Sequence, residues 1–191
     1  LEPDRFAARH ALAVPDHVPV LALLPGSRLS EIANMLPVFL DAAELIAQRI
    51  PSLQILLPAA NAQCDAAIRG HLSPRPELAA RVRVLDGDAQ RAMIASDAVL
   101  LASGTAALEA MLCKRPMVVG HRIAPMTYRI VTRLGLLKTR YVSLPNVLAD
   151  APLIPELLQQ DCVPEKLAAA CLRWFGQPQA VVAVLPRVIE S

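Results

Sequence analysis

Apolar residues along the chain occur in two patterns that alternate from the amino terminus onward. Short continuous apolar runs are typical of strands that are buried on both faces of a sheet. Between them lie longer stretches in which apolar residues recur every three or four positions, as on one face of a helix. We expect strands over residues 18–24, 53–57, 82–85, 98–101 and 116–120.

The longest helical pattern follows the first strand, where Ile32, Phe39 and Ile46 recur at helical spacing. Pro37 interrupts it, so the pattern allows one helix from Ser30 that kinks at the proline, or a short helix before a longer one that starts there. We favour the kinked helix. We expect further helices over residues 3–13, 62–72, 90–96, 105–112, 126–134, 155–159, 164–175 and 181–190. Residues 140–150 are expected to be short, extended and interrupted.

Strands that alternate with helices at this spacing predict an α/β fold, a Rossmann-like parallel sheet with helices on both faces. We assign residues 1–175 to this domain and residues 176–191 to a C-terminal helical extension. Ligands of such sheets bind beyond the carboxyl ends of the strands. Four of the seven glycines lie at these predicted ends, which indicates a binding edge: Gly26, Gly87, Gly104 and Gly120.

Composition and charge narrow the classes of function. Hydrophobic residues make up 54% of the chain but aromatic residues only 3%, which favours an aliphatic core over an aromatic-rich β-sandwich. The net charge of +2 comes without a Lys/Arg tract, so we do not expect nucleic-acid binding. The four cysteines are scattered without a C-x-x-C pair, which favours reduced thiols in the cytosol. We expect no metal and no cofactor, because no ligand motif occurs.

The sequence "PGSR" follows the first predicted strand and opens a helix. Gly26 permits a tight turn, and Ser27 or Ser30 can cap the helix with a hydroxyl. Free N–H groups at a helix start bind anions, and the guanidinium of Arg28 suits phosphate. The alternative is an ordinary capped turn with a solvated arginine. The segment lacks the glycine pattern of a Walker A or a dinucleotide-binding loop.

The sequence "SGT" (Ser103, Gly104, Thr105) opens a second helix after a buried strand and offers another set of free N–H groups. Glu109 lies one turn further along, where a carboxylate is better placed for sugar hydroxyls than for phosphate. Taken alone, Glu109 also fits an ordinary surface position on a helix. Two such turns with cationic help predict a site for a diphosphate with a ribose beside it.

Four motifs in this order resemble the lipid-A-disaccharide synthase family of GT-B glycosyltransferases: "LLPGSRLSEI", "DGDAQRAMIASDAVLLASGTAALEAML", "PMVVGHR" and "YVSLPNVLA…PELLQQ". The resemblance implies that this chain is the C-terminal, UDP-sugar-binding half, and that an acceptor-binding N-terminal domain lies outside it. The family transfers 2,3-diacylglucosamine from its UDP-sugar to 2,3-diacylglucosamine 1-phosphate and releases UDP. Its product is a β-1,6 disaccharide.

The resemblance also implies roles for individual residues. Gly26, Ser27 and Arg28 would meet the diphosphate and the transferred sugar, with Arg28 as the catalytic group that stabilises the leaving UDP. Ser103, Gly104 and Thr105 would hold phosphate, and Glu109 the ribose. The remaining substrate-binding positions are Gly87 and Met93 along the uracil, with Arg122, Asn146, Glu156 and Gln159.

The chain departs from the family pattern at two places. His121 stands where the family commonly has tyrosine, and a single histidine is more often structural than functional. Asp150 and Ala151 stand where the family often has Gly-Arg, so a phosphate role for that loop is in doubt.

Other classes of function stay open at this point. A UDP-sugar 2-epimerase shares the two-domain GT-B plan, and a non-catalytic module could bind UDP without turnover. The acylated substrates imply a place on the cytoplasmic face of the bacterial inner membrane. Residues 126–137 form a basic amphipathic segment that suits a lipid surface, although such a stripe is more often part of a domain core with solvated arginines. A homodimer is a further partner that the sequence leaves open.

Overall fold

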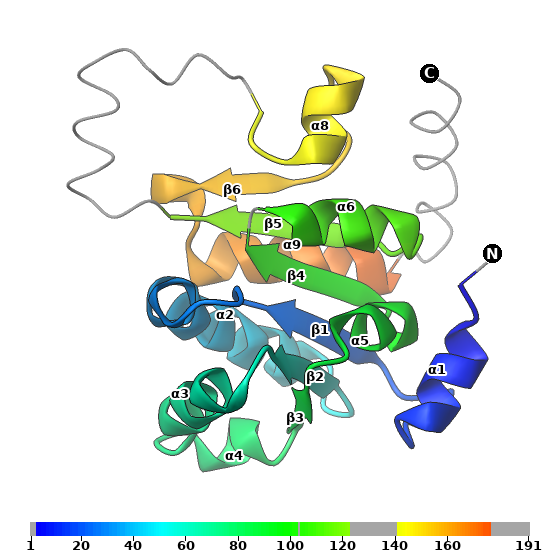
Figure 1. Ribbon diagram of the computed structural model, residues 1–191, viewed down its shortest axis with the longest axis vertical. Helices are drawn as coiled ribbons and strands as arrows, with labels where there is room; N and C mark the ends of the chain where they lie inside the picture. The colour runs from blue at the N-terminus through cyan, green and yellow to red at the C-terminus, as the bar shows by residue number, and fades with distance from the viewer. Residues whose placement is uncertain (1–2, 103, 123–140, 177–191) are drawn as a thin grey trace.

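One parallel sheet organises the protein, for which the computed structural model describes residues 3–102, 104–122 and 141–176 (Figure 1). Its strands are β1 (Val20–Leu24), β2 (Gln54–Ala59), β3 (Val82–Asp86), β4 (Ala98–Ala102), β5 (Met117–His121) and β6 (Glu156–Leu158). They pair in the order β3-β2-β1-β4-β5-β6, all parallel. The predicted α/β class is confirmed. The order reverses between β1 and β4, which creates the switch point where such sheets bind ligands.

Helices cover both faces of this sheet (Figure 1). The described helices are α1 (Arg5–Ala11), α2 (Leu29–Arg49), α3 (Ala62–Leu72), α4 (Pro76–Ala79), α5 (Ala89–Ala95), α6 (Thr105–Leu112), α8 (Leu144–Ala149) and α9 (Pro164–Gly176), with a 3-10 turn, η1 (Gln159–Asp161). Buried side chains of α2, α3, α4 and α9 pack on one face, and those of α1, α5 and α6 on the other.

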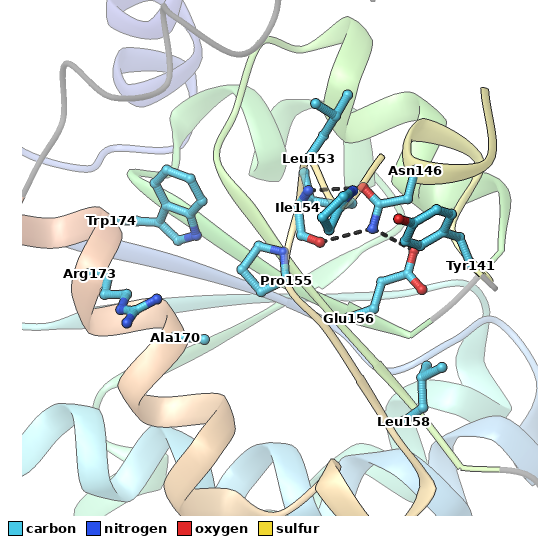
Figure 2. Close-up of a pocket in the computed structure, with 11 residues that line it drawn as sticks. Tyr141, Asn146, Leu153, Ile154, Pro155, Glu156, Leu158, Ala170, Arg173 and Trp174 are labelled. Atoms are coloured by element: carbon cyan, nitrogen blue, oxygen red, sulfur yellow. Dashed lines mark hydrogen bonds between the residues drawn. The ribbon is translucent and has the colours of Figure 1, made fainter. Parts of the chain in front are cut away.

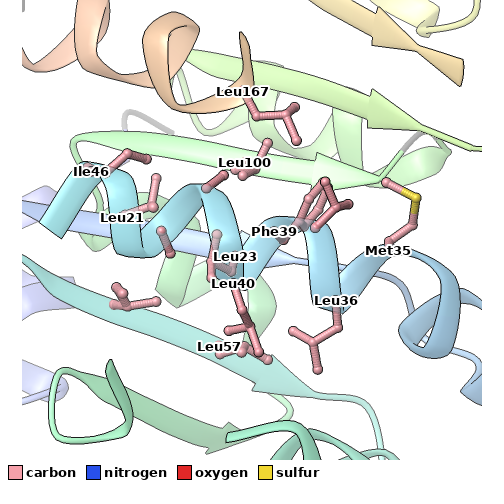
Figure 3. Packing of buried hydrophobic residues seen from close by; sticks show 14 of the residues in the cluster. Leu21, Leu23, Met35, Leu36, Phe39, Leu40, Ile46, Leu57, Leu100 and Leu167 are labelled. Carbon is pink, nitrogen blue, oxygen red and sulfur yellow. The ribbon is translucent and has the colours of Figure 1, made fainter. Parts of the chain in front are cut away.

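Strand β1 shows why its sequence is apolar throughout. Leu21 and Leu23 point into the cluster beneath α2, whereas Ala22 and Leu24 pack with α5 and α6 on the opposite face. All five residues of β1 are buried. Figure 3 shows Phe39 and its neighbours on α2 packed against side chains of β1 and β4. The covered sheet therefore fixes the carboxyl ends of β1 and β4 on a rigid support.

Helix α2 is one continuous helix that contains Pro37, which agrees with the favoured prediction of a single element. Proline lacks an amide hydrogen and removes one hydrogen bond from a helix interior. Burial of Leu36, Phe39 and Leu40 on either side of the proline holds the helix together, because tertiary packing supplies most of the stability of a helix in a protein.

Two predictions about elements were wrong. Residues 144–149 form α8 instead of an extended segment, because Pro145 lies in the first turn of the helix, where its missing N–H has no cost. Residues 156–158 form the edge strand β6 instead of a helix, since pairing with β5 outweighs the local pattern. Asp150 ends α8 with φ 46°, the left-handed conformation that favours the glycine of the family pattern.

Several predictions fall outside the described residues, namely Ser103, the helices at 126–134 and 181–190, and the basic segment at 126–137. The extension at 176–191 does so as well, apart from Gly176. The described helices include none that is long and apolar enough to span a bilayer.

Candidate functional site

A cavity of about 560 Å³ lies at the carboxyl ends of β1 to β4, beside the switch point of the sheet. It gathers segments that are far apart in the sequence. Its lining includes Gly26, Ser27, Arg28, Glu31, Ala59, Ala60, Gly87, Asp88, Ala102, Gly104, Thr105 and Glu109. Seven of the predicted site residues therefore meet in one cavity, as the position of the strand ends requires.

The turn between β1 and α2 is closed by a carboxylate and not by a serine hydroxyl. Oε2 of Glu31 accepts hydrogen bonds from the backbone N–H of Ser27 at 2.8 Å and from that of Arg28 at 3.3 Å. The prediction that Ser27 or Ser30 caps the helix is wrong, because Arg28 takes the N-cap position and Glu31 reaches back to the turn. Gly26 has φ 127°, a conformation that side chains oppose.

The guanidinium of Arg28 projects toward solvent at the mouth of the cavity. Its side chain is 80% exposed, and Nη1 lies 3.3 Å from Oε1 of Glu31. An exposed ion pair of this kind contributes little to stability. Arg28 can therefore exchange its partner for a ligand at small cost.

The start of α6 forms the opposite wall of the cavity. Gly104 is the N-cap residue, with φ 144°. Because glycine has no side chain, the N-cap residue supplies no capping hydrogen bond to the helix start. Thr105 and Glu109 line the cavity from the first two turns of the helix. The unsatisfied N–H groups of a helix start attract anions, so this wall suits a phosphate group. Ser103 lies outside the described residues.

The β3–α5 turn supplies the third wall. Gly87 adopts φ 65°, and its N–H donates to the carbonyl of Ala59 at 2.7 Å. Asp88 pairs with Arg91 at 2.7 Å. Met93 does not reach the cavity, because its side chain is fully buried against β1 and β4. We therefore leave Met93 out of the proposed contact set.

Asn146 and Glu156 line a second cavity, of about 590 Å³, between α8, β6 and α9 (Figure 2). The amide Nδ2 of Asn146 donates to the carbonyl of Ile154 at 2.9 Å and to Oε1 of Glu156 at 2.8 Å. Glu156 also accepts the backbone N–H groups of Val142 and Ser143 at 2.9 and 3.0 Å. In this structure both side chains fasten α8 to β6, and neither lines the first cavity.

Arg122 and Gln159 lie at the same edge of the sheet but outside both cavities. Arg122 follows β5, and its Nη2 donates to the carbonyl of Cys162. Gln159 follows β6 and begins η1 with φ 48°. Burial lowers the pKa of His121, which is the last residue of β5 and pairs with Leu158 of β6.

Glu31 is a charged cavity residue that the sequence did not single out. A glutamate three residues after a helix N-cap is a known signal of a capping box, and Glu31 stands at that distance from Arg28. Among the described residues, no group of three or more His, Cys, Asp or Glu side chains could hold a metal ion.

Comparison with known proteins identifies the family of this chain. A family model described as lipid-A-disaccharide synthetase matches residues 1–180. Lipid-A-disaccharide synthase from Xanthomonas euvesicatoria pv. vesicatoria is 51% identical over 186 residues, which make up 97% of this chain and 42% of that protein. The chain thus spans less than half the length of this curated relative.

Two solved structures share the fold at low sequence identity. The C-terminal CMP-Kdo binding domain of WaaA from Acinetobacter baumannii superposes with a TM-score of 0.63 and 12% identity, over 97% of this chain and 94% of that chain. ADP-heptose lps heptosyltransferase II from E. coli superposes with a TM-score of 0.61 and 17% identity, over 91% of this chain and 51% of that chain. The chain therefore has the fold of the Rossmann-like half of a GT-B protein. By sequence, the chain belongs to the lipid-A-disaccharide synthetase family.

Proposed function

We propose that this chain is the UDP-sugar-binding part of a glycosyltransferase that makes the lipid A disaccharide. The enzyme would transfer 2,3-diacylglucosamine from its UDP-sugar to 2,3-diacylglucosamine 1-phosphate, forming the β-1,6 linkage and releasing UDP. The observation that carries this proposal is the convergence of the Gly26 turn, Gly87 and the start of α6 on one cavity at the switch point. Membership of the family supports the substrate class.

Each wall of the cavity has a proposed task. The diphosphate lies between the Gly26 turn and the N-terminus of α6, where N–H groups and Arg28 neutralise its charge. Glu109 accepts hydrogen bonds from the ribose hydroxyls one turn deeper along α6. Gly87 leaves room for the flat base, because nothing lies within 4 Å of where its Cβ would stand.

The chemistry assigned to this chain is stabilisation of the leaving group. The 6-hydroxyl of the acceptor attacks the anomeric carbon of the donor with inversion while the bond to UDP breaks. Negative charge develops on the diphosphate as it leaves, and Arg28 faces that charge. Preorganised groups of this kind commonly supply a large share of catalysis. The general base and the acceptor site belong to a domain outside this chain.

Arg122 and Gln159 remain proposed donor contacts because they end neighbouring strands on the same edge of the sheet. Asn146 and Glu156 would act indirectly, by holding α8 against β6 near that edge. The acylated substrates lead us to propose a peripheral location on the cytoplasmic face of the inner membrane.

An assay of the full-length protein tests the proposal. We expect release of UDP from UDP-2,3-diacylglucosamine that depends on added 2,3-diacylglucosamine 1-phosphate, with the disaccharide as product. Conversion of the UDP-sugar to its 2-epimer without an acceptor would favour an epimerase. Binding of UDP without transfer or epimerisation would indicate a non-catalytic nucleotide-binding module. Either of these two results would contradict the proposal.

A further inference from the structure

The proposed diphosphate site carries more negative than positive charge. Among the described residues that line the cavity, Arg28 is the cation, whereas Glu31, Asp88 and Glu109 are carboxylates. A diphosphate that enters such a lining meets repulsion unless the carboxylates are paired, used by the ligand or moved away.

Two of the three carboxylates are accounted for. Asp88 forms an ion pair with Arg91 on α5 at 2.7 Å, which neutralises its charge. Glu109 is the group that the proposed function assigns to the ribose hydroxyls. Glu31 remains, and it occupies the position where a phosphate would bind the Gly26 turn.

Glu31 satisfies the same donors that an incoming phosphate would need. Its Oε2 accepts hydrogen bonds from the backbone N–H groups of Ser27 and Arg28, and its Oε1 lies 3.3 Å from Nη1 of Arg28. The backbone has made room for it, because a Cβ on Gly26 would lie 2.4 Å from both Cβ and Oε2 of Glu31. The absence of a side chain at Gly26 thus leaves space for the carboxylate of Glu31.

We propose that Glu31 is an internal anion that fills the amide pocket of the Gly26 turn in the empty site and gives up that pocket to the donor diphosphate. This inference rests on the proposed function and concerns the same site. Phosphate oxygens replace the carboxylate oxygens of Glu31 as acceptors for the two N–H groups and for the guanidinium of Arg28. The turn is therefore held in its binding conformation before the nucleotide arrives.

The displacement needs only side-chain rotation. Glu31 is 37% exposed and lies in the first turn of α2, so its carboxylate can swing into water. Arg28 is 80% exposed and free to follow the phosphate. Neither movement disturbs the buried residues of α2, which begin at Ile32. The ligand must nevertheless compete with Glu31, so that side chain lowers the affinity for diphosphates.

Binding measurements on the full-length protein test this inference. Calorimetric titrations with UDP and with uridine are compared for the wild type and for Glu31→Gln, which keeps the shape but loses the charge. Glu31→Asp, which keeps the charge, is a second variant. Glu165→Gln removes an exposed first-turn carboxylate of α9 and serves as the matched control.

We expect Glu31→Gln to bind UDP about fivefold to tenfold more tightly, with the affinity for uridine unchanged and Glu165→Gln like the wild type. Unchanged or weaker UDP binding by Glu31→Gln, in a protein whose wild type binds UDP, would overturn the inference and leave the proposed function intact. If Glu31→Gln fails to fold, Glu31→Asp takes its place in the test. Because this variant keeps the negative charge, we expect it to bind UDP no more tightly than the wild type. A higher affinity of Glu31→Asp for UDP would contradict the role assigned to the charge. A wild type that does not bind UDP would overturn the proposed function itself.

Discussion

Nη2 of Arg9 lies 2.9 Å from Oδ2 of Asp97, and this pair joins α1 to the start of β4 across 88 positions of sequence. The side chain of Arg9 is fully buried. Its Nη1 also donates to the carbonyls of Pro15, Asp16 and Val18, at 2.8 to 2.9 Å. Oδ2 of Asp97 accepts the N–H of Val20 as well, so the pair fixes the entry of β1.

Removal of Arg9 should destabilise the protein strongly. Arg9→Ala removes one of the two arginine partners of Asp97 and leaves four carbonyl groups without their donor. Loss of one member of a buried ion pair costs about 3–5 kcal/mol. Chemical denaturation should show this loss in the free energy of unfolding. Arg69→Ala, which removes an exposed pair with Asp65, is the control and should change stability little. An Arg9→Ala protein as stable as the control would contradict the assigned role.

Gly120 on β5 packs against α2 with no room for a side chain. A Cβ at this position would lie 2.8 Å from Cε1 of Phe39 and 3.3 Å from Sγ of Cys162. Gly120→Ala should therefore lower the free energy of unfolding by about 1–3 kcal/mol, as overpacked cores do.

Gly70 provides the opposite case within the same chain. It lies inside α3, and nothing is within 4 Å of where its Cβ would stand. Gly70→Ala should stabilise the protein by about 0.5–1 kcal/mol, because alanine favours the helix. Thermal denaturation of both variants checks the pair of predictions. Equal melting temperatures for the two variants would show that the packing around Gly120 is not tight.

His121 should make stability depend on pH. Burial lowers its pKa below 6.5, so the unfolded chain binds the proton more readily than the folded one. The free energy of unfolding therefore falls as the pH drops below about 6.5 toward the folded-state pKa, and the lost stability returns as the pH rises.

Denaturation of the wild type and of His121→Gln at about pH 7.5 and about pH 5.5 measures this contribution. The variant should lose less stability than the wild type between the two conditions. His10→Gln changes an exposed histidine on α1 and should behave like the wild type. The same pH dependence in all three proteins would argue against a buried, neutral His121.

Local pattern was enough to predict the elements that the sheet buries. The apolar runs gave the five strands β1 to β5, and the predicted helices at 62–72 and 105–112 coincide with α3 and α6. These segments carry strong periodicity bounded by turn residues, so local preference and tertiary packing agree. The convergence of Gly26, Gly87 and Gly104 followed from the rule that parallel strands share one carboxyl edge.

The errors arose where local and long-range effects differ. Pro145 looked like an interruption, although the first turn of a helix accepts proline. Strand β6 has three residues, too few to show a period, and depends on pairing with β5. Glu31 and Arg9 act through contacts with backbone groups, which no hydrophobic pattern records. The hydrogen bond between Asn146 and Glu156 joins residues on two different elements, so the local sequence pattern does not predict it.

The affinity of the full-length protein for UDP, compared between Arg28→Ala and Arg49→Ala, tests the central claim most directly. Both arginines belong to the α2 region, but Arg28 is at the cavity and Arg49 is an exposed residue at the far end of the helix. A charge-assisted hydrogen bond contributes about 1.5–3 kcal/mol, so Arg28→Ala should weaken UDP binding roughly tenfold to a hundredfold. Arg49→Ala should bind like the wild type. Equal affinities for UDP in the two variants would contradict a diphosphate site at the Gly26 turn.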